Sequence, residues 1–142
     1  MTCVVDSSAT LAWLLADERN DATTSVFRLV ARNGAVVPSI WPIEVANGLN
    51  MAARRDRITH NVRDQHLSDL TLLAIEIDGD TAVHAWHATL KLADMHGLTV
   101  YDAAYLELAQ RRRLPLATLD KALIGAAAKT GVKVLPEVSA PS

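Results

Sequence analysis

Short apolar, β-branched runs alternate with longer helical patterns along the whole chain, and this alternation restricts the fold more than any other feature. The apolar runs are continuous, as expected for strands that are covered on both faces. Successive strands that are separated by helices form parallel crossovers, which place a sheet between two helical layers. The sequence therefore predicts an α/β fold, a three-layer α/β/α sandwich with a mostly parallel central sheet.

Capping residues, glycines and prolines give the expected boundaries of these elements. We expect strands at residues 2–5, 35–39, 73–78, 115–119 and 132–135. We expect helices at residues 7–15, 20–32, 42–55, 61–73, 81–96, 102–112 and 121–129. Asp6 or Ser7 is suited to cap the first helix, while Gly34 and Gly97 end the helices that precede them.

The length and composition of the chain favour a single domain in a reducing compartment. The 142 residues contain no linker and no repeat, so we predict one domain over residues 1–136, with a frayed tail at 137–142. The only cysteine, Cys3, has no partner for an internal disulfide. We find no signal peptide and no apolar run of membrane-spanning length, so we expect a cytoplasmic protein with no membrane contact. The net charge of −2 argues against nucleic-acid binding through bulk charge alone.

Four acidic residues are predicted to meet at one edge of the sheet. Asp6 ends the first strand, Asp120 ends the fourth, and Asp102 opens the helix between the third and fourth strands. Glu44 lies in the first turns of the helix that follows the second strand. Ligands of open parallel sheets bind beyond the carboxyl ends of the strands, so these four side chains are candidates for one site.

Two interpretations of these acids remain open from the residues alone. Four converging carboxylates repel one another unless a divalent cation lies among them, and oxygen ligands of this kind suit Mg²⁺ or Mn²⁺. Such a metal can generate hydroxide and stabilise a phosphodiester transition state. Alternatively, each aspartate is a helix cap, for which Asp6 and Asp120 are well placed. Capping explains Asp102 least well, because Thr99 can cap the same helix.

The acidic motifs resemble a known family. VVDSSATLAWLL, IWPIEVANGL, GLTVYDAAYLELA and LPLATLDKAL resemble, in this order, the four acidic motifs of PIN-domain ribonucleases, and among these the VapC toxins of bacterial toxin–antitoxin systems. The resemblance covers nearly the whole chain. It implies a PIN-like fold and a metal-dependent endoribonuclease toxin of a type II system, which hydrolyses RNA phosphodiester bonds.

The resemblance also implies roles for individual residues. Asp6, Glu44, Asp102 and Asp120 correspond to the catalytic acids, which hold one or two Mg²⁺ or Mn²⁺ ions in the family. Ser8 and Thr118 correspond to hydroxyl positions that support the acids through hydrogen bonds.

The partners that the resemblance implies are RNA, a second copy of the chain and a VapB-type antitoxin. We expect the antitoxin's C-terminal segment to lie in a groove between the helices at residues 7–32 and the helix that carries Glu44. An arginine of the antitoxin is expected to reach the acids. The apolar stretch GLNMAA is a candidate for the homodimer interface.

Two other functional classes compete with the nuclease. One is a catalytically silent PIN-like binding module, against which the four intact acids argue. The other is a Mg²⁺-dependent phosphate-handling signalling domain, which is disfavoured because VVDSS has one acid where such domains usually carry two. The arginines at residues 54–57 and 111–113 lie at helix ends far from the acids, which weakens the case that they contact RNA.

Overall fold

The computed structural model describes residues 1–137 and contains one five-stranded parallel sheet in the order β3-β2-β1-β4-β5. The strands are β1 (Cys3–Val5), β2 (Ala35–Val37), β3 (Ile75–Ile77), β4 (Leu116–Ala117) and β5 (Val134–Leu135). Each strand lies within a predicted one and is shorter than it. Apart from Glu137, the tail that we predicted to be frayed lies outside the described residues.

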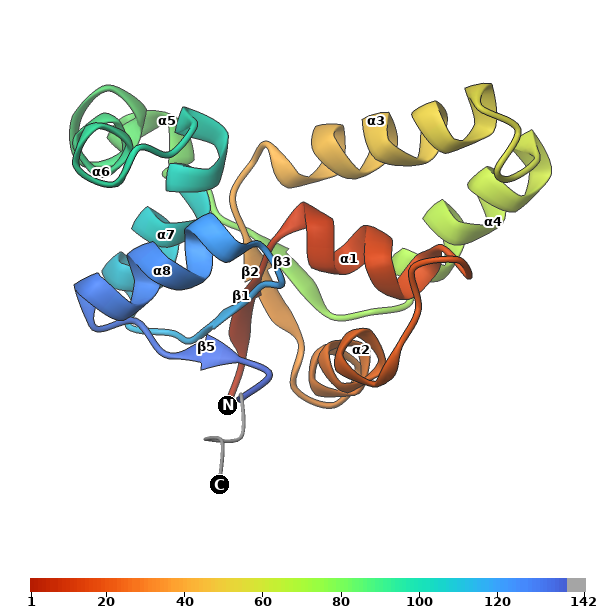
Figure 1. Ribbon diagram of the computed structural model, residues 1–142, viewed down its shortest axis with the longest axis horizontal. Helices are drawn as coiled ribbons and strands as arrows, with labels where there is room; N and C mark the ends of the chain where they lie inside the picture. The colour runs from red at the N-terminus through yellow and green to blue at the C-terminus, as the bar shows by residue number, and fades with distance from the viewer. Residues whose placement is uncertain (138–142) are drawn as a thin grey trace.

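The helices form a layer on each side of the sheet (Figure 1). The first layer contains α1 (Ser7–Leu14), α2 (Asp21–Asn33), α3 (Trp41–Arg54) and α4 (His60–Leu70). The second contains α5 (Thr81–His84), α6 (Leu90–His96), α7 (Val100–Arg112) and α8 (Lys121–Thr130). The chain runs from β1 through β2 to β3 at one edge of the sheet, and then crosses back to β4 and β5 on the other side of β1. Right-handed crossovers that run in opposite directions along a sheet place their helices on opposite faces. The predicted α/β/α sandwich is confirmed.

Burial differs between the centre and the edge of the sheet. Every residue of β1, β2 and β4 is buried, as the continuous apolar runs predict. β3 is an edge strand, and Ile77 is 51% exposed. Here the expectation that both faces are covered was wrong, because an apolar run does not reveal whether its strand lies at an edge.

The helix predicted at residues 81–96 is not one regular α-helix. A π-helical turn, η1 (Ala85–Thr89), separates α5 from α6, and Gly97 ends α6 in a left-handed conformation as expected. Apolar periodicity does not distinguish such a turn from a continuous helix. None of the helices within residues 1–137 is long and apolar enough to cross a membrane.

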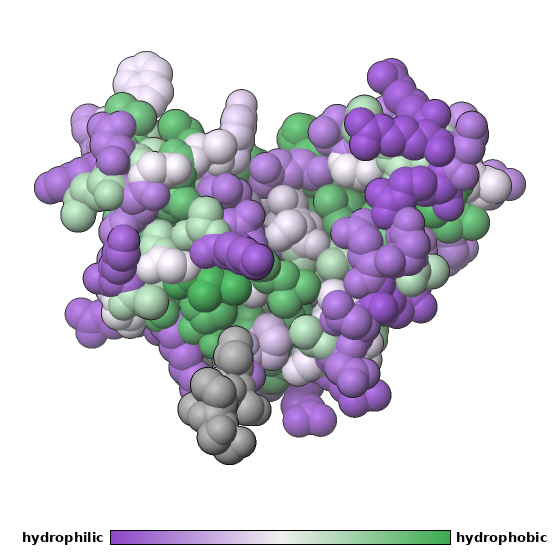
Figure 2. All heavy atoms as spheres, viewed as in Figure 1, coloured by the Kyte–Doolittle hydropathy of each residue, from purple (hydrophilic) through white to green (hydrophobic). Residues whose placement is uncertain are grey.

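Strand β1 lies where the sheet topology reverses. Its neighbours β2 and β4 are reached through connections on opposite faces, so the carboxyl ends of β1 and β4 border a topological switch point. The surface is hollowed above this edge, between the part of the molecule formed by α5 and α6 and the part formed by α3 (Figures 1 and 2).

Candidate active site

Asp6 directly follows β1 and is 3% exposed. Its Oδ1 accepts a hydrogen bond from the backbone N–H of Ala9 at 2.8 Å and thereby caps α1. Its Oδ2 accepts hydrogen bonds from the hydroxyls of Ser8 at 2.9 Å and Thr118 at 2.5 Å. The structure thus brings both predicted hydroxyl residues onto one oxygen of the first predicted acid.

Asp120 follows β4 and is linked to Asp6 through Thr118. The backbone N–H of Asp120 donates to Thr118 Oγ1 at 3.0 Å, and Asp120 Oδ1 accepts from the backbone N–H of Leu123 at 2.9 Å, which caps α8. The capping interpretation is therefore right for Asp6 and Asp120. It does not exclude a further role, because each cap uses only one carboxylate oxygen.

Glu44 lies in the first turn of α3, where close packing of α3 on α1 places it. At Gly48, one turn later, an added Cβ would lie 2.3 Å from Leu11 Cδ1, so glycine allows this approach. Glu44 Oε1 accepts a hydrogen bond from Ser7 Oγ at 3.3 Å and a shorter one from the Tyr105 hydroxyl at 2.6 Å. The Tyr105 contact joins α3 to α7 and was not predicted.

Asp102 lies in the first turn of α7, but it is not the cap of that helix. Thr99 is the cap, and its Oγ1 accepts from the backbone N–H of Asp102 at 3.1 Å. The pKa of the Asp102 carboxyl is raised, first by burial and then by the negative charges of Asp120 and Glu44. The charges of two of the other predicted acids therefore act on the Asp102 carboxyl.

The charge of the site is not balanced by the protein. The pKa of Asp6 is raised to about 6, mainly by burial and also by the charge of Asp120, against the opposing hydrogen bonds from Thr118, Ala9 and Ser8. None of the four acids forms a salt bridge with a residue in the described part of the chain. Burial and the neighbouring Glu44 also hold the pKa of Tyr105 above its usual range, so the phenol stays a neutral donor.

The donor set suits a hard divalent cation, although the carboxylates are not gathered around one point. Within residues 1–137, no three His, Cys, Asp or Glu side chains lie close enough together to hold a metal ion. Hydrogen bonds from described residues do not engage Glu44 Oε2 or Asp120 Oδ2. Oxygen donors of this kind fit Mg²⁺ or Mn²⁺.

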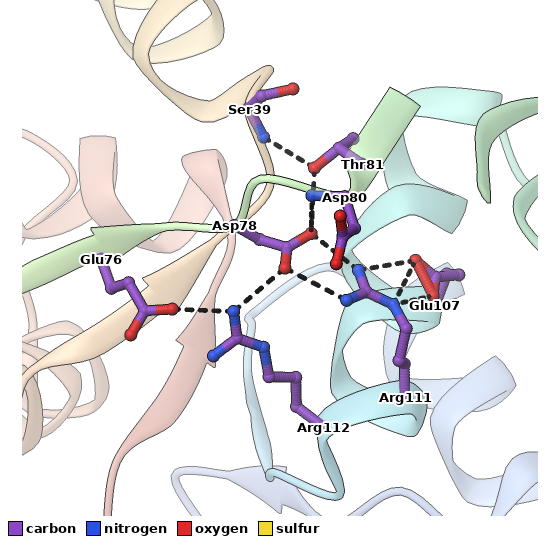
Figure 3. Close-up of polar contacts among 8 residues, drawn as sticks. All are labelled: Ser39, Glu76, Asp78, Asp80, Thr81, Glu107, Arg111 and Arg112. Carbon is purple, nitrogen blue, oxygen red and sulfur yellow. Dashed lines mark hydrogen bonds and ion pairs between the residues drawn. The ribbon is translucent and has the colours of Figure 1, made fainter. Parts of the chain in front are cut away.

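In a second acidic cluster, which the sequence did not predict, Asp78, Glu107 and Glu76 are each paired with an arginine (Figure 3). Asp78 directly follows β3 and pairs with Arg111 at 2.7 Å and with Arg112 at 3.1 Å. Arg111 also pairs with Glu107 at 2.8 Å, and Arg112 with Glu76 at 2.7 Å. These two arginines, considered above as candidate RNA contacts, instead bind α7 to the end of β3.

The comparisons with known proteins agree with this fold. Residues 3–129 match the PIN domain family. The chain belongs to the PIN-domain family. This PIN domain is 33% identical over 127 residues to Ribonuclease VapC3 of Pyrobaculum aerophilum, a match that covers 87% of this chain and 92% of that protein. The family resemblance drawn from the acidic motifs is thereby confirmed.

Solved structures share the fold of this PIN domain. A crystal structure of PAE2754 from Pyrobaculum aerophilum matches with a TM-score of 0.69 and 23% identity, over 95% of this chain and 84% of that one. VapBC2 from Rickettsia felis, bound to a DNA fragment from its promoter, matches with a TM-score of 0.62 and 15% identity, over 94% and 97%. FitAcB from Neisseria gonorrhoeae matches with a TM-score of 0.61 and 18% identity, over 94% and 96%.

Proposed function

We propose that this PIN domain is a Mg²⁺- or Mn²⁺-dependent endoribonuclease and the toxin of a type II toxin–antitoxin pair. The observation that carries the proposal is the unbalanced negative charge of Asp6, Glu44, Asp102 and Asp120 at the switch point of the sheet. A buried or half-buried carboxylate without a cationic partner is costly, and a bound divalent cation would remove that cost. The similarity to Ribonuclease VapC3 supports RNA as the substrate.

In this proposal the four acids hold the metal, which when bound supplies a Lewis acid and an activated water for phosphodiester hydrolysis. The chain's own contribution is to hold the ligands in place. Ser8 and Thr118 fix one oxygen of Asp6 through their hydroxyls. Such supporting hydrogen bonds orient ligands and are worth about 10–100-fold in metal affinity or activity.

An antitoxin partner is supported by the structural relatives, which include VapBC2 from Rickettsia felis and a toxin–antitoxin complex from Klebsiella pneumoniae. A cavity of about 510 Å³ lies between α1, α2 and α4, and its lining includes Trp13, Leu14, Phe27 and Leu70. This cavity is bordered by α4 and not by α3, so the groove that we expected between residues 7–32 and the helix that carries Glu44 stays a prediction. A mainly apolar groove of this kind fits a short amphipathic segment of a partner.

A homodimer is also part of the proposal, but much of the apolar surface of GLNMAA is not available to its interface. Leu49, Ala52 and Ala53 of that stretch are buried in the core of the monomer. Exposed apolar side chains occur instead at other positions, including Ile43 in the first turn of α3 and Trp86 of η1, which is 85% exposed. Light scattering on the purified chain would measure the oligomeric state directly.

Cleavage of RNA by the purified, partner-free chain tests the proposed activity. The substrates are tRNA, rRNA fragments and mRNA, each with Mg²⁺ or Mn²⁺ and with EDTA. Asp102→Asn is the test variant, and Asp94→Asn is its control, because Asp94 is an exposed acid on α6. We expect discrete cuts by the wild type and Asp94→Asn that disappear with EDTA and with Asp102→Asn.

Two other results would contradict the proposal. Cuts that survive in Asp102→Asn would exclude the acidic edge as the nuclease site. Metal binding without cleavage of any RNA in the panel would favour a silent binding module, which is the alternative that membership of the PIN family leaves open.

A further inference from the structure

Tyr105 is a buried residue whose hydroxyl reaches the acidic edge. It is 1% exposed and is among the largest fully buried side chains of the molecule. Its ring lies in the core beneath α7, while its hydroxyl donates to Glu44 Oε1 at 2.6 Å. The partners are 61 positions apart in sequence, so the bond joins two elements that meet only in the folded protein.

The hydrogen bond restricts a side chain that otherwise has much freedom. Glutamate has several rotatable bonds, and fixing it costs conformational entropy unless a partner holds it. Both donors to Glu44, Tyr105 and Ser7, bind the same oxygen, Oε1. Glu44 Oε2 is thereby left without a hydrogen bond from the described residues. The carboxylate is held by one oxygen and presents the other.

We propose that Tyr105 is a positioning residue that orients Glu44 so that its Oε2 is available to a divalent cation at the acidic edge. This inference rests on the proposed metal-dependent function. Tyr105 itself is not a ligand in this proposal, and its effect passes entirely through Glu44. A tyrosine that served only the core would contribute packing through its ring and would leave metal affinity unchanged when its hydroxyl is removed.

Tyr105→Phe separates these roles, because it removes one oxygen and keeps the buried ring. The matched control is Tyr101→Phe on the same helix, one turn earlier, where the side chain is 62% exposed. Mn²⁺ binding to each protein is measured by calorimetry, and thermal unfolding in EDTA reports whether the fold is kept. We expect Tyr105→Phe to bind Mn²⁺ about 10–100-fold more weakly than the wild type. Tyr101→Phe should bind as the wild type does.

A double variant tests whether Tyr105 acts through Glu44, and it also covers the case in which Tyr105→Phe lowers stability. If the effect passes through Glu44, Glu44→Gln with Tyr105→Phe binds Mn²⁺ no more weakly than Glu44→Gln alone. Equal Mn²⁺ affinity of Tyr105→Phe and the wild type would overturn the inference. So would an additive loss in the double variant, or no Mn²⁺ binding by the wild type.

RNA cleavage, measured on the same proteins, distinguishes failure of this inference from failure of the proposed function. A weaker Mn²⁺ affinity in Tyr105→Phe without cleavage by any of the proteins would support the positioning role and contradict the proposed nuclease function. If the wild type cleaves, we expect Tyr105→Phe to need more Mn²⁺ for half-maximal rate, with an unchanged KM for RNA. Cleavage by Tyr105→Phe with an unchanged Mn²⁺ requirement would support the proposed nuclease function and overturn the positioning role.

Discussion

Asp6 and Asp78 occupy similar places in the sheet but have opposite surroundings. Each directly follows a strand, and their exposures are 3% and 1%. The Arg111 and Arg112 guanidinium groups lower the pKa of Asp78 to about 2, with Arg111 as the main cause. The pKa of Asp6 is raised to about 6, mainly by burial and also by the charge of the neighbouring Asp120. A buried carboxylate at a strand end thus forms a structural ion pair when arginines lie next to it. It is a candidate cation site when other acids lie next to it.

The largest change in unfolding free energy is expected from removing an arginine that pairs with Asp78. Arg111→Met leaves Asp78 and Glu107 buried with one fewer cation, and loss of one partner from a buried pair costs about 3–5 kcal/mol of unfolding free energy. The control is Arg54→Met at the exposed end of α3, for which we expect a change within about 0.5 kcal/mol. Urea unfolding measures both. Equal losses in the two variants would show that the Asp78 cluster is not a special source of stability.

A smaller change in unfolding free energy is expected from pH, and it has opposite signs for the two aspartates. Folded Asp6 binds protons more tightly than unfolded Asp6, so in EDTA its contribution to stability falls as pH rises from about 4 to 6, by on the order of 2–3 kcal/mol. The pKa of Asp78 is lowered on folding, so its contribution is present above about pH 4 and is lost toward pH 2.

Unfolding free energy measured against pH for the wild type and Asp6→Asn tests this contrast. Asp6→Asn should remove the fall between pH 4 and 6 while keeping the loss of stability toward pH 2. An unchanged fall in Asp6→Asn would mean that another group causes it.

The smallest effect is a gain in stability from neutralising Asp102. Its charge is opposed by burial, Asp120 and Glu44, so Asp102→Asn should raise the metal-free unfolding free energy at pH 7. Asp94→Asn carries the same charge change at an exposed position and should have little effect. Thermal unfolding in EDTA compares the two. Destabilisation by Asp102→Asn would mean that the charge serves the fold rather than a ligand.

The sequence predicted the features that depend on local pattern. Apolar runs, Gly34 and Gly97 gave the order of the elements, and the parallel crossovers gave the sheet. Asp6 and Asp120 could be placed because each ends a strand, and Thr99 could be identified as the cap of α7 from its spacing.

The contacts between distant elements could not be predicted in this way. Asp78 and Arg111 are 33 positions apart, and Glu44 and Tyr105 are 61 apart. Periodicity indicates which face of an element is buried, but it does not indicate which polar groups will meet across that face. The motif YDAAYLELA therefore gave no sign that its second tyrosine would reach Glu44.

Mn²⁺ binding is the measurement that tests most directly whether the unbalanced acids form a cation site. Electron paramagnetic resonance of free Mn²⁺ gives the bound fraction for the wild type, Asp102→Asn, Asp94→Asn and Arg111→Met. We predict that Asp102→Asn binds about tenfold or more weakly than the wild type, since even supporting residues are worth that much. Asp94→Asn and folded Arg111→Met should bind as the wild type does. Absence of binding by the wild type, or equal binding by Asp102→Asn, would contradict the distinction between the two acidic regions.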